Sequence, residues 1–201
     1  MAAPSPTDAE LIARVVVNDD RHAFSELVRR YQSGVRATLR RLTAGNHALA
    51  DDLAQETFLL AYRNLRAFRQ EARFSTWLYR IATNAFLAYS RKRREELLGD
   101  ADADIGDDAD AAPGEGDSTP DHARATALSI DMERALAVLS DAERAAIVQC
   151  YHNDLSHEEA AYVLGCPVGT VKTHILRGKQ KMKAYLTAWA PPSAAAAKGA
   201  P

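Results

Sequence analysis

The chain has 201 residues, of which 47% are hydrophobic, 26% charged and 7% aromatic, a composition that excludes collagen-like and wholly disordered proteins. Its formal net charge of -2 conceals a partition along the sequence. Residues 21–94 hold 15 Lys and Arg against 5 Asp and Glu, whereas residues 95–121 hold 11 acidic residues and no basic ones. The basic block favours a polyanionic partner.

The sequence also bears on the compartment. No segment reaches the roughly 18 consecutive apolar residues that a membrane span needs, and the first ten residues lack the basic and apolar parts of a signal peptide. Two cysteines, Cys150 and Cys166, are too few for the disulfide framework of a small secreted protein. We therefore expect a cytoplasmic protein.

The first part of the chain, residues 8–98, has apolar residues at spacings of three and four, which indicates helices. Thr7 and Glu10 have the spacing of a capping box that opens the first of them. Polar breaks at residues 18–21, 44–47 and 69–73 predict four helices in this unit.

Three of the five acids in the basic block, Asp51, Asp52 and Glu56, fall within six residues. The favourable interaction of carboxylates with a helix N-terminus is sufficient to explain the first two. Alternatively, with Leu53 and Phe58, which we expect to be exposed, they form a docking surface for a basic protein.

Aromatic and basic residues are interleaved between residues 73 and 94, a mixture that suits phosphates and stacked bases. Aromatic residues at helical spacing more often belong to the core, and we expect Trp77, Ile81 and Phe86 there. The basic run 91–94 fits either phosphate contact or cations at a helix C-terminus.

Residues 99–121 consist mostly of Asp, Ala, Gly and Pro, with Ile105 as the one large apolar residue. Such a segment cannot bury enough surface to offset its ordering entropy, so we expect a flexible acidic linker. The linker separates a unit at 8–98 from a second at 122–189, and we expect residues 190–201 to be disordered.

The second unit has the pattern of a helix-turn-helix. Capping boxes start at Ser140 and Ser156, and a turn at residues 165–167 divides a short helix from a long basic one. Four apolar residues would pack the two helices together: Ala160, Leu164, Val171 and Ile175. The opposite face of the long helix would carry Lys172, Thr173, Leu176, Arg177 and Gln180.

A basic second helix of this kind suits insertion into the DNA major groove. A solvated helix face is the competing interpretation, because lysines near a helix C-terminus are favoured in any case. Five Cys and His residues lie close together in sequence, but their spacing matches no zinc motif: Cys150, His152, His157, Cys166 and His174. With no catalytic motif present either, we expect no metal, no cofactor and no enzyme activity.

Five segments in this order resemble the extracytoplasmic-function (ECF) sigma factors, small specificity subunits of bacterial RNA polymerase in the sigma-70 family. Segments 24–31 (FSELVRRY), 51–65 (DDLAQETFLLAYRNL) and 74–84 (FSTWLYRIATN) resemble region 2 of that family. Segments 135–144 (ALAVLSDAER) and 155–172 (LSHEEAAYVLGCPVGTVK) resemble region 4.

The resemblance implies an all-α protein with a four-helix region 2 at 8–98 and a helix-turn-helix region 4 at 122–189. It assigns docking on the clamp helices of the largest core subunit to Asp51, Asp52, Gln55, Glu56, Phe58 and Leu59. It assigns contacts with the minus-ten element to Phe68, Arg69, Gln70, Arg73, Thr76, Arg80, Asn84, Arg91, Arg93 and Arg94. It assigns contacts with the minus-thirty-five duplex to Lys172, Thr173, His174, Leu176, Arg177 and Gln180.

The implied partners are core polymerase, at its clamp helices and flap, promoter DNA, and an anti-sigma factor or other regulator that could hold the protein at the inner membrane. Three positions depart from the family pattern: Ala88 replaces a frequent Asp, His174 a frequent Arg, and Gly178 a usual Ala. We expect the helix to bend or fray beyond Gly178. The acidic linker either threads the basic channels of the polymerase, serves as a tether, or folds back over the basic unit.

Two other functions fit parts of the sequence. The segment 155–175 also resembles the DNA-binding domain of LuxR-type regulators, although residues 1–98 show no α/β pattern of a receiver or ligand-binding domain. An adapter that binds polymerase or a partner protein without reading DNA is the second alternative, and the exposed Lys172 and Arg177 argue against it.

Overall fold

The structure is a computed structural model that describes residues 5–99 and 130–189. In the N-terminal unit the helices are α1 (Asp8–Asn18), α2 (Arg21–Leu42), α3 (His47–Asn64), a 3-10 turn (Leu65–Ala67) and α4 (Phe74–Gly99). In the C-terminal unit a helical segment at 130–137 precedes α6 (Asp141–Tyr151), α7 (His157–Leu164) and α8 (Val168–Trp189). The described residues contain no strand, which confirms the expected all-α class.

Local sequence signals set the helix boundaries. The side chains of Thr7, Asp20 and Asn46 accept hydrogen bonds from the first turns of α1, α2 and α3, which satisfies amides that a helix leaves unpaired. Ser140 and Ser156 form the two expected capping boxes at α6 and α7. The four helices predicted for the N-terminal unit and the breaks between them are therefore confirmed.

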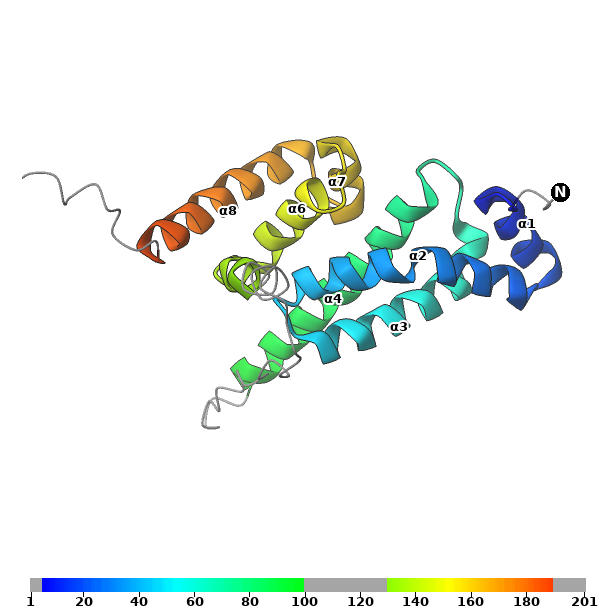
Figure 1. Ribbon diagram of the computed structural model, residues 1–201, viewed down its shortest axis with the longest axis horizontal. Coiled ribbons are helices and arrows are strands. Elements are labelled where there is room, and N and C mark those ends of the chain that lie inside the picture. Colours follow the sequence, from blue (N-terminus) through cyan, green and yellow to red (C-terminus); the bar gives the residue numbers. More distant parts are fainter. Residues whose placement is uncertain (1–4, 100–129, 190–201) are drawn as a thin grey trace, which may run out of the picture.

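The core of the N-terminal unit lies between α1, α2, α3 and α4, and α2, α3 and α4 run alongside one another in Figure 1. Phe86 is buried in this core, and Trp77 and Ile81 pack against it half-buried. The core position expected of Phe86 is confirmed, whereas Trp77 and Ile81 lie at the edge of the core.

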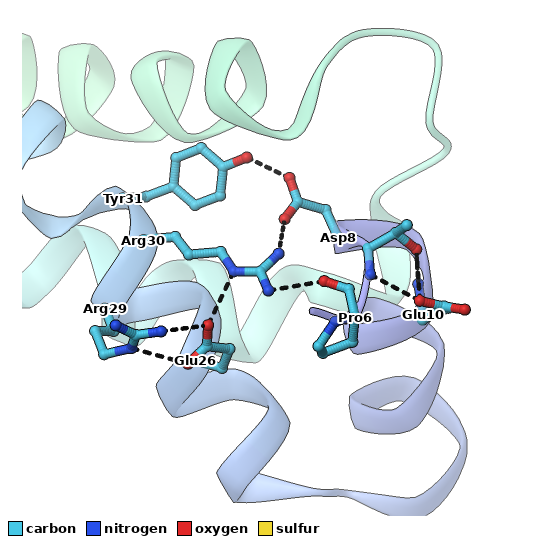
Figure 2. A network of polar contacts seen from close by, with 8 residues as sticks. Pro6, Asp8, Glu10, Glu26, Arg29, Arg30 and Tyr31 are labelled. Atoms are coloured by element: carbon cyan, nitrogen blue, oxygen red, sulfur yellow. Dashed lines mark hydrogen bonds and ion pairs between the residues drawn. The ribbon is translucent and has the colours of Figure 1, made fainter. Parts of the chain in front are cut away.

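A polar network fastens α1 to α2 (Figure 2). Asp8 accepts hydrogen bonds from Arg30, at 2.9 Å, and from the Tyr31 hydroxyl. Arg30 also donates to Glu26, and the two arginines beside Glu26, Arg29 and Arg30, lower the pKa of its carboxyl to about 2. This network fixes the N-terminal helix against the long helix that follows it.

In the C-terminal unit, Ala146, Ala160, Val171 and Ile175 form a small buried cluster that joins α6, α7 and α8, with Leu164 packed against it. The predicted packing of the helix-turn-helix is thereby confirmed. The turn between α7 and α8 begins at Gly165, whose φ of 63° lies in the left-handed region, where glycine has no steric cost.

The two units pack against each other, which their separation by a linker in the sequence did not predict. α7 lies on α4, and α6 lies on α2 and α4. Ala145 and Val148 of α6 belong to the same buried cluster as the core of the N-terminal unit. In Figure 1, α8 extends away from the bundle of α2, α3 and α4.

Two expectations concern residues that the structure does not describe. The acidic linker at 99–121 lies outside the described residues except for Gly99, and the tail at 190–201 lies wholly outside them. Within residues 5–99 and 130–189, no helix is long and apolar enough to cross a membrane.

Candidate nucleic-acid interface

The acidic face predicted for docking lies on α3. Asp52, Gln55, Glu56 and Leu59 are exposed on it, and Leu59 keeps 59% of its surface accessible. Asp51 is half-buried and forms an ion pair with Arg36 of α2 at 3.4 Å. The exposed surface of α3 therefore carries two carboxylates, those of Asp52 and Glu56, and the apolar side chain of Leu59.

The exposure expected for two apolar neighbours was wrong. Leu53 is buried in the core because it points toward the bundle interior, and Phe58 is half-buried. Phe58 and Leu59 instead line an open groove of about 580 Å³ between α2 and α3. Its other apolar walls are Phe24, Val28, Ala54 and Tyr62, with Arg21, Ser25, Gln32, Arg36 and Gln55 around them.

The loop between the 3-10 turn and α4 carries four of the predicted minus-ten residues. Phe68 anchors the loop, since its ring packs against Phe74 and Trp77 with centroids 5.5 and 5.1 Å apart. Arg69, Gln70 and Arg73 are exposed. Two guanidinium groups and an amide thus lie in solvent on a loop whose base is fixed by aromatic packing.

On α4, Asn84 is exposed, whereas Arg80 is half-buried with its guanidinium 4.6 Å from the ring centroid of Tyr162 in α7. Thr76 is 1% exposed, and its hydroxyl has no hydrogen-bond partner among the described residues. The period of α4 turns Thr76 into the bundle, so its side chain is not accessible to a DNA strand in this arrangement.

The basic run at the end of α4 is exposed. Arg91 and Arg93 point into solvent, and Arg94 forms an ion pair with Asp141 of α6 at 2.9 Å. The structure therefore brings α4 and the loop before it together as one basic surface, part of which α6 and α7 cover.

The long helix α8 displays the residues predicted for the major groove. Lys172, Thr173, Leu176, Arg177 and Gln180 are all exposed, and His174 is half-buried. Two lysines farther along have partners within the protein: Lys181 bonds the buried carboxylate of Glu143 at 2.7 Å, and Lys179 lies over the Tyr151 ring. Direct contact with DNA is thus open to the first half of the helix.

The fraying expected beyond Gly178 was wrong, because α8 continues to Trp189. Gly178 is buried where α8 crosses α6, and a Cβ built there would lie 2.5 Å from Cδ1 of Ile147. Close packing against α6 supports the helix at the position where its intrinsic propensity is weakest.

A second apolar groove, of about 610 Å³, lies in the C-terminal unit between the helical segment 130–137, α6 and α8. Met132, Ile147, Tyr151, Met182 and Leu186 line it, with Lys179, Lys183 and Thr187 beside them. No motif in the sequence indicates this surface.

A buried polar contact between the two units was not predicted from the sequence. Gln149, fully buried in α6, donates to the Thr83 hydroxyl of α4 at 2.9 Å. The only signal is its place in the run 145–149, where it follows four apolar residues.

Among the residues that the structure describes, no group of three or more His, Cys, Asp and Glu side chains could hold a metal ion.

Comparison with known families identifies the family to which the chain belongs. Residues 27–96 match the model of sigma-70 region 2, and residues 129–182 match that of sigma-70 region 4. The chain belongs to the ECF sigma factors of the sigma-70 family. It directs promoter-specific initiation by RNA polymerase as a non-enzymatic subunit. The LuxR-type interpretation was wrong, because residues 27–96 are sigma region 2.

Curated relatives support the assignment over most of the chain. ECF sigma factor SigW of Bacillus subtilis is 34% identical over 175 residues, which cover 85% of this chain and 92% of the relative. SigE of Mycolicibacterium smegmatis is 36% identical over 167 residues, 82% of this chain and 62% of the relative.

Two solved structures share the fold. The sigma factor RpoE of Bartonella quintana, in complex with the anti-sigma factor NepR, aligns with a TM-score of 0.64 and 26% identity, over 82% of this chain and 96% of that chain. CnrH, in complex with the cytosolic domain of CnrY, aligns with a TM-score of 0.63 and 27% identity, over 91% and 99%.

Proposed function

We propose that this sigma factor reads the minus-thirty-five duplex with the exposed face of α8. The observation that carries the proposal is the helix-turn-helix geometry, in which one face of the second helix is exposed to solvent. Five side chains lie on that face: Lys172, Thr173, Leu176, Arg177 and Gln180. Arg177 can donate two hydrogen bonds to a guanine edge, and Leu176 offers apolar contact to a thymine methyl group. His174, half-buried, is a weaker phosphate ligand than an arginine.

The loop 68–73 and the exposed part of α4 take the minus-ten strand in this proposal. Extrusion of a base costs a few kcal/mol, which phosphate contacts and a fixed pocket offset. Arg69, Gln70, Arg73, Arg80 and Asn84 supply those contacts, with Phe68 holding the loop in place. Arg91, Arg93 and Arg94 extend the basic surface toward the upstream duplex. Thr76 is left out because it is buried.

Core docking is assigned to α3 and the groove beside it. Asp52, Gln55 and Glu56 are exposed at the edge of an apolar groove that Phe58 and Leu59 line. An apolar groove with a carboxylate rim suits a basic helical hairpin, such as the clamp helices of the largest core subunit. Asp51 supports this face through its ion pair with Arg36.

The groove beside α8 is the proposed site for the polymerase flap, since five apolar side chains with lysines beside them form an accessible apolar surface there. The same two grooves are available to an anti-sigma factor. Of the solved structures named above, RpoE is in complex with the anti-sigma factor NepR, and CnrH is in complex with the cytosolic domain of CnrY. We propose that this chain also has such a regulator, which could hold it at the inner membrane.

We propose a domain organisation in which each of the two regions forms one functional unit. Region 2 occupies residues 8–98 and region 4 residues 122–189, with the linker at 99–121 between them and the tail at 190–201. We propose that the protein acts in the cytoplasm, at the nucleoid.

Transcription with purified bacterial core polymerase tests this function. The protein is added to core on a fragmented genomic library, and RNA start sites are mapped with and without it. Discrete new starts that share two spaced motifs are expected. Absence of new starts, with the free protein protecting duplex DNA by itself, would overturn the assignment of polymerase-dependent promoter reading.

A further inference from the structure

The loop 68–73 closes on a cluster of aromatic rings. Phe68 and Phe74 bracket residues 69–73 and lie edge to face, with their ring centroids 5.5 Å apart. Trp77 of α4 packs on both rings, 5.1 Å from that of Phe68 and 5.7 Å from that of Phe74. Because tilted and edge-to-face ring pairs are favourable, this packing holds the two ends of the loop together.

Tyr31 of α2 joins this cluster to α1. Its ring lies edge to face against the buried ring of Phe74, with centroids 5.3 Å apart. Its hydroxyl donates a hydrogen bond to the carboxylate of Asp8, the first residue of α1 (Figure 2). A path of direct contacts therefore runs from Asp8 through two aromatic rings to the loop residue Phe68.

Asp8 is itself held in place by Arg30. Nη1 of Arg30 donates to the second oxygen of the carboxylate at 2.9 Å, and Nη2 donates to the carbonyl of Pro6 at 2.7 Å. Nε of Arg30 donates to Glu26 at 3.0 Å, so every nitrogen of the guanidinium group has an acceptor (Figure 2). Charge-assisted bonds of this kind are the stronger ones in proteins, and they leave the other carboxylate oxygen directed at Tyr31.

The bond between Tyr31 and Asp8 persists across the physiological range of pH. Burial, reinforced by the hydrogen bond to Asp8, raises the pKa of Tyr31 to about 12. A phenol with that pKa stays protonated and continues to donate, so the bond is a fixed part of the structure rather than a switch.

The backbone of the loop needs support from outside the loop. Gln70 has a φ of 58°, in the left-handed region that residues with a side chain rarely adopt. Such a conformation persists where the surrounding structure imposes it. Arg69, Gln70 and Arg73 are exposed, so the packing of Phe68 and Phe74 supplies the restraint.

We propose that Asp8 and Tyr31 are positioning residues for promoter melting. The hydrogen bond between them fixes the Tyr31 ring against Phe74 and thereby keeps the loop 68–73 in the conformation that receives the extruded base. A loop that is ordered before DNA arrives does not have to be ordered at the expense of binding energy. Neither residue contacts DNA in this role. The inference deepens the proposed function and rests on its assignment of the loop to the minus-ten strand.

Tyr31→Phe tests the proposal, since it removes the hydroxyl and keeps the ring. The full-length protein is combined with core polymerase on a promoter found by the start-site mapping, with 2-aminopurine in place of each minus-ten adenine of the non-template strand in turn. Its fluorescence rises when the base is unstacked and gives the rate of opening at saturating sigma factor. We expect that rate to fall roughly threefold to tenfold, as the loss of one hydrogen bond predicts, while affinity for core, measured by competition, is unchanged.

Two further variants show whether the effect belongs to this bond. Asp8→Ala should slow opening in the parent but have a smaller effect in the Tyr31→Phe background, because there the bond is already absent. Asp8→Asn keeps an oxygen that can accept from Tyr31 and should open the promoter faster than Asp8→Ala.

Arg14→Ala is the matched control for a general loosening of α1. Arg14 is exposed and bonds Asp20 at 3.0 and 2.7 Å, at the C-terminal end of α1 and away from Asp8. Exposed ion pairs contribute little to stability, so the opening rate of this variant should match that of the parent.

An unchanged opening rate in Tyr31→Phe, equal slowing in Arg14→Ala, or fully additive effects of Asp8→Ala and Tyr31→Phe would overturn the proposal. So would a loss of core affinity in proportion to the loss of rate, because the defect would then lie in folding rather than in the loop. Failure of the proposed function is seen in the parent protein itself, as an absence of discrete starts or of a fluorescence rise at the minus-ten element, and overturns both.

Discussion

Gly178 of α8 lies directly against Ile147 of α6, so close that a Cβ at position 178 would be 2.5 Å from Cδ1 of Ile147. The relationship explains why a residue of low helix propensity lies within α8, the helix to which we assign contact with DNA. The glycine lets α8 approach α6 where the two helices cross, and the crossing holds the helix-turn-helix together.

This contact predicts a coupling between two substitutions. Gly178→Ala gains about 1 kcal/mol of helix propensity but overpacks the crossing at a cost of about 1 to 3 kcal/mol, so the free energy of unfolding should fall by up to about 2 kcal/mol. Ile147→Val removes the atom in conflict and costs about 0.5 to 1.5 kcal/mol by itself. In urea unfolding followed by circular dichroism, the double variant should be about 1 kcal/mol more stable than the sum of the single changes. Strict additivity would contradict this account.

The docking face on α3 predicts a charge-reversal effect. Asp52→Lys places a cation opposite a basic partner, where like charges cost several kcal/mol, and should weaken core binding by at least about tenfold. The measurement is competition for core against an unmodified sigma factor. Asp51 is the poorer choice because its ion pair with Arg36 gives it a structural role.

Glu158→Lys is the matched control for that experiment, since Glu158 is also an exposed acid on a helix but lies on α7. It should leave core affinity within about twofold of the parent, as expected for surface charges away from an interface. Equal losses in both variants would show that net charge, rather than the α3 face, governs binding.

The exposed face of α8 predicts base-specific losses. Arg177→Ala should cost about 1 to 3 kcal/mol at the minus-thirty-five element without a change in core affinity, because the side chain is exposed and lies on the face of α8 assigned to DNA. Transcription from promoters mutated at each minus-thirty-five position measures the effect. A loss of the same size on every sequence would instead assign Arg177 to a phosphate.

Much of the fold followed from sequence, because helix periodicity and capping are local. The capping boxes at Thr7, Ser140 and Ser156 gave correct starts, and the spacing of Ala160, Leu164, Val171 and Ile175 gave the correct packing of α7 on α8. The exposure of Lys172 and Arg177 followed from the same periodicity.

What the sequence did not predict depends on contacts between distant segments. The exposure expected of Leu53 was wrong because a difference of one residue in helical phase decides whether a side chain faces the bundle or solvent. Gln149 and Thr83, 66 residues apart, carry no local sign that they meet. The contact between the two units could not be inferred from segments that each have their own periodicity.

The bond between Arg41 and His152 predicts that acid weakens the contact between the units. Burial, reinforced by the positive charge of Arg41, lowers the pKa of His152 from its usual 6.5, and the negative charge of Asp154 opposes this only in part. The imidazole must be neutral to accept the Arg41 hydrogen bond at 3.0 Å. Because the pKa is lower in the folded state, unfolded chains bind more protons, and stability decreases as pH falls. The contribution of His152 is therefore complete well above pH 6.5 and is lost as pH falls through 6.5 toward the lowered pKa.

His152→Gln separates this effect from the titration of other groups. The glutamine carbonyl can still accept from Arg41 but does not titrate, so the decrease in the free energy of unfolding between about pH 7.5 and 5.5, measured by urea unfolding, should be shallower than in the parent. An identical pH dependence in parent and variant would remove His152 as the cause. A steeper dependence in the variant would show that the imidazole stabilises the contact in its charged form, the opposite of what its position beside Arg41 requires.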